Sequence, residues 1–228
     1  MSGQQVFARD AASDARAFEL QRTFRALLDC LARPGEVVFL ESSERAAGDA
    51  KAAGAFPGTL MVADALLDAG TTFSVAEGPE GALDQLVARR THARALPAER
   101  AAYALVTDAV RDEAATAYVE SLSSGTLEEP HMGATCIIEC SVLLGLDAQG
   151  GKVGSASHSH AKSCWELEGP GVDGAARIVV DRADVMRARE SRGDEFPCGI
   201  DLVFVDGFGH MVAVPRSSAC KEVESWDM

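Results

Sequence analysis

Apolar side chains near the start of the chain repeat at the spacing of an α-helix. Four of them stand at positions i, i+3, i+4 and i+7 and would share one helical face: Phe24, Leu27, Leu28 and Leu31. Ser13 or Asp14 is a candidate cap at the beginning of this helix, and Pro34-Gly35 is a stop signal at its end. The pattern therefore predicts a first helix that ends before residue 34.

The next hundred residues alternate between short apolar runs and amphipathic stretches. The short runs predict strands at 37–40, 71–75 and 102–106, and the amphipathic stretches predict helices at 60–67, 81–90 and 112–122. Residues 42–55 are polar and rich in alanine and glycine, so we predict a loop with little regular structure there.

Residues 134–146 form the longest apolar run and predict one central, buried strand. The stretch 149–163 is polar and predicts either a surface excursion or a disordered loop. Beyond it the pattern predicts strands at 163–167 and 177–180, a helix at 181–191, and a hairpin whose strands 200–205 and 211–214 flank the turn 206–209. The acidic tail after Cys220 has little to bury and is predicted to be loose.

This order of elements predicts an α/β fold. Helices and strands alternate early, and strands cluster late, which is typical of a mixed central sheet with helices on both faces. No repeat and no linker interrupts the pattern, so we expect a single domain over residues 1–228.

Composition narrows the function classes. Acidic residues outnumber basic ones 35 to 21, which gives a net charge of −14, and no basic run offers a site for nucleic acid. No apolar run approaches the roughly 18 residues needed to span a membrane, and the first residues lack the pattern of an export signal. We therefore expect a cytoplasmic protein whose six cysteines are free thiols.

Two turn-bearing segments are the first candidates for chemistry. Gly169-Pro170-Gly171 follows a predicted strand, where a glycine-rich turn can bind phosphate, but it lacks a P-loop lysine and the dinucleotide fingerprint. Cys198 is a possible nucleophile without a recognisable histidine partner. Asp201 can hold a turn, cap a helix or pair with Arg216, and Arg216 can bind an anion or a carboxylate. A structural role is the favoured interpretation of both segments.

The histidines offer a weaker candidate. His158 and His160 would share one face of an extended segment, and Cys164 and His131 could complete a set of four zinc ligands. The spacing matches no established metal motif, so solvated histidines are the favoured interpretation and no metal is expected.

Motifs along nearly the whole chain resemble the PhnH family, a subunit of the bacterial carbon–phosphorus lyase system for phosphonate use. They are Gln21-x-x-Phe24-Arg25-x-Leu27-Leu28, Pro34-Gly35, Ala63-Asp64-Ala65-Leu66-Leu67-Asp68, Val106-Thr107-Asp108, Leu122-Ser123-Ser124-Gly125-Thr126, Pro130, Gly133-Ala134-Thr135, Leu167-x-Gly169-Pro170-Gly171-Val172, Phe196-Pro197-x-Gly199-Ile200-Asp201 and Val214-Pro215-Arg216-Ser217-Ser218. Each motif is weak alone, but their order is specific. Cys198 stands where a leucine is common, and Ser217 and Ser218 stand where threonines are usual.

The resemblance implies a fold and a set of partners. The family fold looks like a reduced large domain of the pyridoxal-phosphate-dependent transferases, without the cofactor. The family subunit is a homodimer alone and joins a core complex with PhnG, PhnI and PhnJ. With PhnG, PhnI and PhnL it is tied to transfer of the ribose triphosphate of ATP onto a phosphonate, whereas the radical cleavage of the C–P bond belongs to PhnJ. The resemblance carries over no catalytic residue and no cofactor.

Two function classes remain open. The leading hypothesis is an accessory, non-catalytic subunit of the carbon–phosphorus lyase core complex. The alternative is a subunit with its own site for a nucleotide or a phosphonate near Gly169, Gly171, Asp201 and Arg216.

Overall fold

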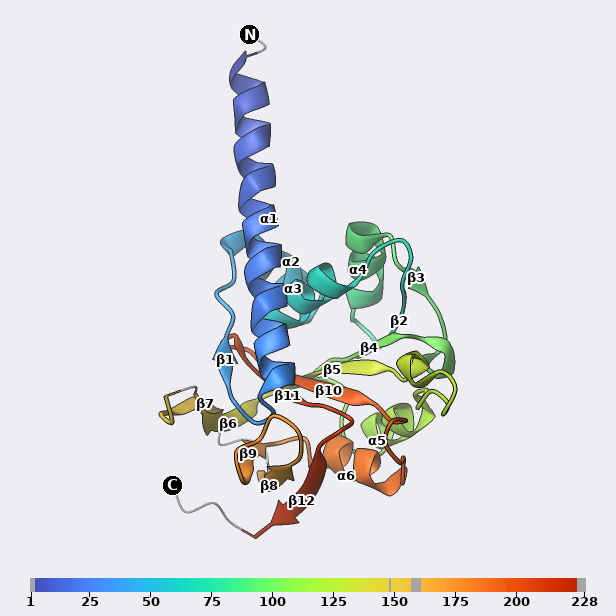
Figure 1. Cartoon of the computed structure of the whole chain (residues 1–228). Helices are drawn as coiled ribbons and strands as arrows, with labels where there is room; N and C mark the ends of the chain where they lie inside the picture. Colours follow the sequence, from blue (N-terminus) through green and yellow to red (C-terminus); the bar gives the residue numbers. More distant parts are fainter. Residues whose placement is uncertain (1–2, 148, 157–160, 225–228) are drawn as a thin grey trace.

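The computed structural model describes residues 3–147, 149–156 and 161–224 and contains two β-sheets (Figure 1). The larger sheet has seven strands in the order β1-β11-β10-β5-β4-β2-β3. Its strands are β1 Val38–Phe39, β2 Thr72–Ala76, β3 Arg94–Ala95, β4 Tyr103–Val106, β5 Thr135–Cys140, β10 Asp201–Asp206 and β11 His210–Val214. The α/β class and the mixed sheet are therefore as predicted.

The direction of the strands divides the larger sheet into two parts. The pairs β3–β2, β2–β4, β4–β5 and β5–β10 are parallel, whereas β10–β11 and β11–β1 are antiparallel. Strands β10 and β11 form the predicted hairpin, in which Leu202 lies opposite Val214. Strands β2, β4, β5 and β10 therefore run in the same direction. Their amino ends lie along one side of the sheet, which we call the amino edge, and their carboxyl ends lie along the opposite side, the carboxyl edge.

The smaller sheet is antiparallel, with the order β12-β8-β9-β6-β7. It consists of β6 Val142–Leu146, β7 Lys152–Ala156, β8 Ser163–Glu168, β9 Ala176–Val180 and β12 Ala219–Val223. This sheet was not predicted as a separate layer, because strand periodicity does not reveal which strands pair.

Helices cover both faces of the seven-stranded sheet (Figure 1). One face carries α1 Gly3–Ala32, α2 Glu44–Ala52, α3 Pro57–Leu66 and α4 Leu83–Thr91. The other face packs on α5 Asp112–Ser121, α6 Ala183–Ser191 and the smaller sheet, which together share one apolar core. Short 3-10 helices lie at η1 Ala98–Arg100 and η2 Pro130–Met132.

The apolar run 134–146 is two strands, so the prediction of one central strand was wrong. Strand β5 ends at Cys140 in the larger sheet, and β6 begins at Val142 in the smaller one. Asp181 holds the crossing between them, because its Oδ1 accepts the N–H of Ser141 and the N–H of Val142, each at 3.1 Å. Both strands are largely buried, and the run therefore contains no polar signal for the break.

Three other predictions need correction. Residues 42–55 contain helix α2, whose first turn is capped by Ser43 Oγ accepting the Ala46 N–H at 3.3 Å. Ser13 and Asp14 lie inside α1 and do not begin it. Residues 221–223 of the tail belong to β12, which pairs with β8, so this part is ordered by long-range contacts; residues 225–228 lie outside the described residues.

The apolar stripe of α1 is only partly buried. Leu27 is 2% exposed, but Phe24 and Leu28 are 44% and 49% exposed. Thr23 and Cys30 occupy the buried face in their place. Within the described residues, no helix is both long and apolar enough to cross a lipid bilayer.

Candidate functional site

Several of the motifs named above lie side by side at the amino ends of the parallel strands. Thr135 pairs with Asp201 on one side and with Tyr103 on the other, so β10, β5 and β4 begin at the same level. The loop between α5 and β5, residues 122–134, runs along this edge. Two hollows lie at this edge. One is lined by Cys198 and Arg216, and we name it the Cys198 hollow. The other is lined by Arg94 and His131, and we name it the Arg94 hollow.

Asp201 and Arg216 form an ion pair at this amino edge. Arg216 Nη2 lies 2.6 Å from Asp201 Oδ2, Nε lies 3.1 Å from the same oxygen, and the Arg216 backbone N–H donates to Oδ1 at 2.8 Å. The fork of the guanidinium thus engages one carboxylate side-on. This pairing is one of the alternatives that the sequence left open for Asp201.

Arg216 also holds the 122–134 loop. Its Nη1 donates to the carbonyl of Pro130 at 2.6 Å, and Nη2 donates to the carbonyl of Gly133 at 3.1 Å. Nearly all the guanidinium donors are thus bonded to protein groups. The geometry favours a role in fixing the loop over direct capture of an anion by this side chain.

Gly169 and Gly171 lie in the turn between β8 and β9, with positive φ values of 141° and 85°. A Cβ at residue 169 would stand 2.9 Å from the Ser217 carbonyl oxygen, and one at residue 171 would overlap the Ala32 carbonyl oxygen. Glycine is therefore required by the close approach of the backbone, which joins this turn to the end of α1 and to the Arg216 segment.

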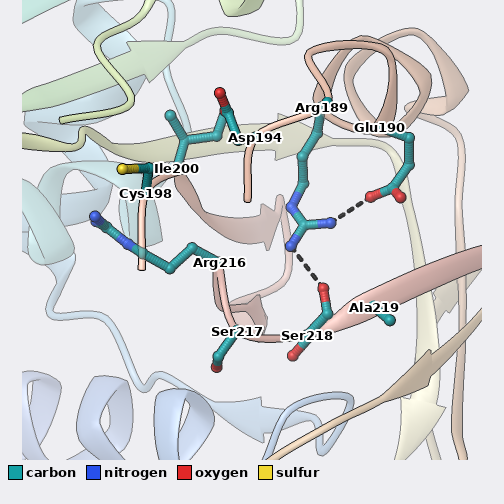
Figure 2. Close-up of a pocket in the computed structure, with 11 residues that line it drawn as sticks. Arg189, Glu190, Asp194, Cys198, Ile200, Arg216, Ser217, Ser218 and Ala219 are labelled. Carbon is teal, nitrogen blue, oxygen red and sulfur yellow. Dashed lines mark hydrogen bonds and ion pairs between the residues drawn. The ribbon is translucent and has the colours of Figure 1, made fainter. Parts of the chain in front are cut away.

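The Cys198 hollow has a volume of about 260 Å³ and is drawn in Figure 2. Cys198, Arg189 and Arg216 line it, together with Ser217 and Ser218. In Figure 2 the Arg216 side chain extends away from Arg189, toward the side on which Cys198 lies. Of the four predicted ligand-binding residues, Arg216 lines this hollow, whereas Gly169, Gly171 and Asp201 are not among its lining residues.

Arg189 is bonded to the protein in the same way as Arg216. Its Nη2 donates to the carbonyl oxygens of Pro215 at 2.9 Å and Ser218 at 2.8 Å, and its Nη1 lies against Glu190 and Cys220. Burial raises the pKa of the Cys220 thiol to about 12, so this sulfur is a poor nucleophile at neutral pH. Both arginines that line the Cys198 hollow thus donate hydrogen bonds to backbone carbonyl oxygens of the protein.

The Arg94 hollow lies on the other side of the loop and has a volume of about 400 Å³. Arg94, Arg100 and His131 line it, with the hydroxyl-bearing Thr72 and Ser123. The sequence pattern did not single out these residues as a site. They come from β2, β3, η1, the loop after α5 and η2, and no local motif connects them.

The carboxyl ends of the same strands carry a buried ionic network. Glu139, which is 1% exposed, accepts the Phe56 N–H at 2.6 Å and the Asp108 N–H at 3.0 Å. Burial raises the pKa of Glu139, although these hydrogen bonds oppose the shift. Arg182 is fully buried and donates to the carbonyl oxygens of Glu139 at 2.7 Å and Val110 at 2.9 Å.

Further charges close this carboxyl edge. Arg111 Nη2 lies 3.0 Å from Asp181 Oδ2 and also contacts Asp108. At the end of β10, buried Asp206 accepts the Ser155 hydroxyl at 2.5 Å and lies 2.8 Å from His210 Nδ1. These groups bond to one another, so the edge has the character of a polar core.

The predicted zinc set is only partly within the described part of the chain. His158 and His160 lie outside the described residues. Cys164 is buried on β8, and His131 is exposed in η2 at the amino edge of the other sheet. Over residues 3–147, 149–156 and 161–224, no three His, Cys, Asp or Glu side chains form a group that could hold a metal ion.

Comparison with known proteins agrees with the motif order. A family model described as "Bacterial phosphonate metabolism protein (PhnH)" matches residues 11–221. No curated protein matches the chain. Because the family model covers most of its length, the chain belongs to the PhnH family, which acts in bacterial phosphonate metabolism.

Proposed function

We propose that this member of the PhnH family works as an accessory subunit of the carbon–phosphorus lyase core complex. Its partners would be PhnG, PhnI and PhnJ. With PhnG, PhnI and PhnL it would support transfer of the ribose triphosphate of ATP onto an alkylphosphonate. The observation that carries the proposal is family membership over residues 11–221 combined with large apolar side chains left exposed on α1, β1 and the β10–β11 turn.

The exposed apolar side chains at the β1 side of the sheet support a docking role. Phe39 is 61% exposed and Phe208 is 72% exposed. Phe39 lies edge-on to the His210 ring, with 5.6 Å between ring centroids. Because β1 is an edge strand with only two residues, it offers both apolar surface and unpaired backbone groups to a partner.

Helix α1 supports association as well. Its N-terminal half projects beyond the rest of the fold (Figure 1), and Phe18 on it is 65% exposed. An isolated helix is marginally stable in water, so a second chain that packs on the projecting segment would stabilise it. We propose that α1 contributes to a homodimer when the subunit is alone, and light scattering on the purified chain tests this.

Co-expression tests the complex. The tagged chain is expressed with PhnG, PhnI and PhnJ, and we expect all three to co-purify. The double variant Phe39→Ser/Phe208→Ser should reduce recovery of at least one partner. Phe196→Ser is the matched control, because Phe196 is 71% exposed but lies away from β1 in the sequence segment before β10. A wild-type chain that purifies alone in this system would disprove the proposal.

A second candidate function is a ligand site near Gly169, Gly171, Asp201 and Arg216 for a nucleotide or a phosphonate. The Cys198 hollow favours it, because Arg216 and Arg189 line a space of about 260 Å³. Calorimetry with ATP and with methylphosphonate tests it. Heat that is lost in Arg216→Gln but kept in Arg94→Gln would support the site, and no heat with either compound would count against it.

We propose further that the fold is a reduced version of the large domain of pyridoxal-phosphate-dependent transferases. The parallel strands with helices on both faces are consistent with it. We also propose that residues 1–228 form one domain, since the two sheets share one apolar core and β5 runs directly into β6.

A further inference from the structure

The Arg94 hollow contains two arginines that form no ion pair with any described residue. Most arginines whose side chains the structure describes form ion pairs, such as Arg216 with Asp201 and Arg90 with Asp64. In the described part of the chain, no carboxylate lies within 4.0 Å of the Arg94 or Arg100 guanidinium. In a chain of net charge −14, two such arginines in one hollow form a local positive site.

Two hydroxyl groups in this hollow are available to donate hydrogen bonds. Thr72 Oγ1 accepts the Ala102 N–H at 3.0 Å, and Ser123 Oγ accepts the Gly125 N–H at 3.2 Å. Each oxygen is therefore oriented by the backbone as an acceptor, and its own hydrogen remains for a ligand. With the two guanidinium groups, the donors exceed the acceptors, of which Glu99 is the charged one.

Two arginines outside the Arg94 hollow, Arg192 and Arg216, hold the 122–134 loop that forms one of its walls. Arg216 binds the carbonyl oxygens of Pro130 and Gly133, on either side of His131 and Met132. Arg192 Nη2 donates to the Leu122 carbonyl at 2.7 Å, just before Ser123. These internal arginines pre-organise the loop, which lowers the entropy that binding would cost.

We propose that the Arg94 hollow binds a small ligand that carries a PO₃ group, such as an alkylphosphonate or a phosphate ester. Arg94 and Arg100 would bind the anionic oxygens, and Thr72 and Ser123 would donate to them. Leu96 and Met132 give the hollow an apolar side for the organic part of the ligand. A volume of about 400 Å³ is within the usual range for small-molecule sites.

The test is a titration of the isolated full-length chain followed by ³¹P NMR, with methylphosphonate, ribose 5-phosphate and inorganic phosphate as separate probes. We expect saturable binding of methylphosphonate or ribose 5-phosphate with a Kd of about 1 mM or below. Arg94→Gln and Arg100→Gln should each weaken it about tenfold, because each removes a charged hydrogen bond. Tighter binding of methylphosphonate would identify the phosphonate as the ligand, and tighter binding of ribose 5-phosphate would identify the phosphate ester.

Arg89→Gln is the matched control. Arg89 is exposed on α4, has no ion pair among the described residues, and does not line the hollow. It should leave the Kd within about twofold, because it lies outside the reach of a charged hydrogen bond to the ligand. In ¹H NMR spectra of the same titration, the ring protons of His131 should shift on binding, whereas those of His92 should not.

The proposal is overturned if none of the three probes binds saturably, or if Arg89→Gln weakens binding as much as Arg94→Gln. Equal affinity for inorganic phosphate and methylphosphonate would overturn the role of Leu96 and Met132. Because the titration uses the isolated chain, its result is independent of whether PhnG, PhnI and PhnJ co-purify.

Discussion

The two ends of the parallel strands use their charged side chains differently. At the carboxyl ends of β5 and β10, Glu139, Arg182 and Asp206 are buried and bonded to other protein groups. At the amino ends of β2 and β4, Arg94 and Arg100 line an open hollow without carboxylate partners among the described residues. The same sheet therefore has one closed polar edge and one open one.

This difference bears on where function is sought in an open α/β sheet. Ligands usually bind beyond the carboxyl ends of the strands. Here Arg182 and Glu139 fill that position. Arg182 donates to the backbone carbonyl of Glu139, and the Glu139 side chain accepts the Phe56 N–H at the start of α3. The amino edge, where the family motifs 122–135 and 214–218 meet, is the more open surface.

The largest effect is expected at the closed edge. Arg182→Met leaves Asp184 and the carbonyl oxygens of Glu139 and Val110 without their donor in a buried site. We expect a loss of about 3–5 kcal/mol in the free energy of unfolding, measured by urea denaturation. Arg177→Met is the control, since its pair with Glu166 is exposed and should change stability by about 1 kcal/mol or less. Equal losses in the two variants would contradict a special role for the closed edge.

A smaller effect is expected from Arg216→Lys at the open edge. Lysine keeps the charge but cannot bond Asp201, Pro130 and Gly133 together. We expect a loss of about 2 kcal/mol in stability and faster hydrogen exchange in residues 123–133. Unchanged exchange in this loop would show that Arg216 does not hold it.

The titration of Glu139 makes the free energy of unfolding depend on pH. Burial raises the pKa of Glu139 in the folded protein above its ordinary value of 4.5, so the folded state binds this proton more tightly than the unfolded state does. Its contribution to stability is thus fully present below pH 4.5 and is lost as pH rises through the raised pKa.

The variant Glu139→Gln removes this titration. We expect the wild-type free energy of unfolding to fall relative to the variant, with a slope of at most about 1.4 kcal/mol per pH unit above pH 4.5. Chemical denaturation at a series of pH values measures the slope. Parallel curves for the two proteins would contradict the raised pKa.

The smallest effect concerns thiol reactivity and leaves stability almost unchanged. Cys140 lies at the closed edge, where burial raises the pKa of its thiol well above 9.0. Cys198 lines the Cys198 hollow at the amino edge. A thiol reagent should modify Cys198 first, at least about a hundredfold faster than Cys140. Cys198→Ser should remove the fast phase, and Cys140→Ser should keep it. A fast phase that survives Cys198→Ser would place the reactive thiol elsewhere.

The local elements were largely predictable. The β10–β11 hairpin follows from the turn at Asp206–Gly209, where Asp206 Oδ1 accepts the N–H groups of Phe208 and His210. Helix α2 was missed because alanine- and glycine-rich polar segments give little periodicity, although Ser43 followed by Glu44 was a readable cap. Strand β12 was missed because its pairing with β8 is long-range.

The candidate site was less predictable than the fold. The pairing of Asp201 with Arg216 was one of several alternatives in the sequence and is present in the structure. The Arg94 hollow gave no signal, because Thr72, Arg100 and His131 belong to separate segments that only the sheet brings together. A list of arginines cannot show which ones lack a partner in the folded chain.

The sequence by itself determined the element types with strong periodicity, the hairpin turn, the excess of negative charge and, through the order of its motifs, the family. These are properties of neighbouring residues or of composition. Tertiary structure decided that residues 134–146 divide between two sheets, that Arg216 faces the loop at Pro130, and that one edge of the sheet is closed and the other open. The reason is that strand pairing and charge neutralisation join residues far apart in the chain, and the backbone pattern within each segment carries no record of its partner.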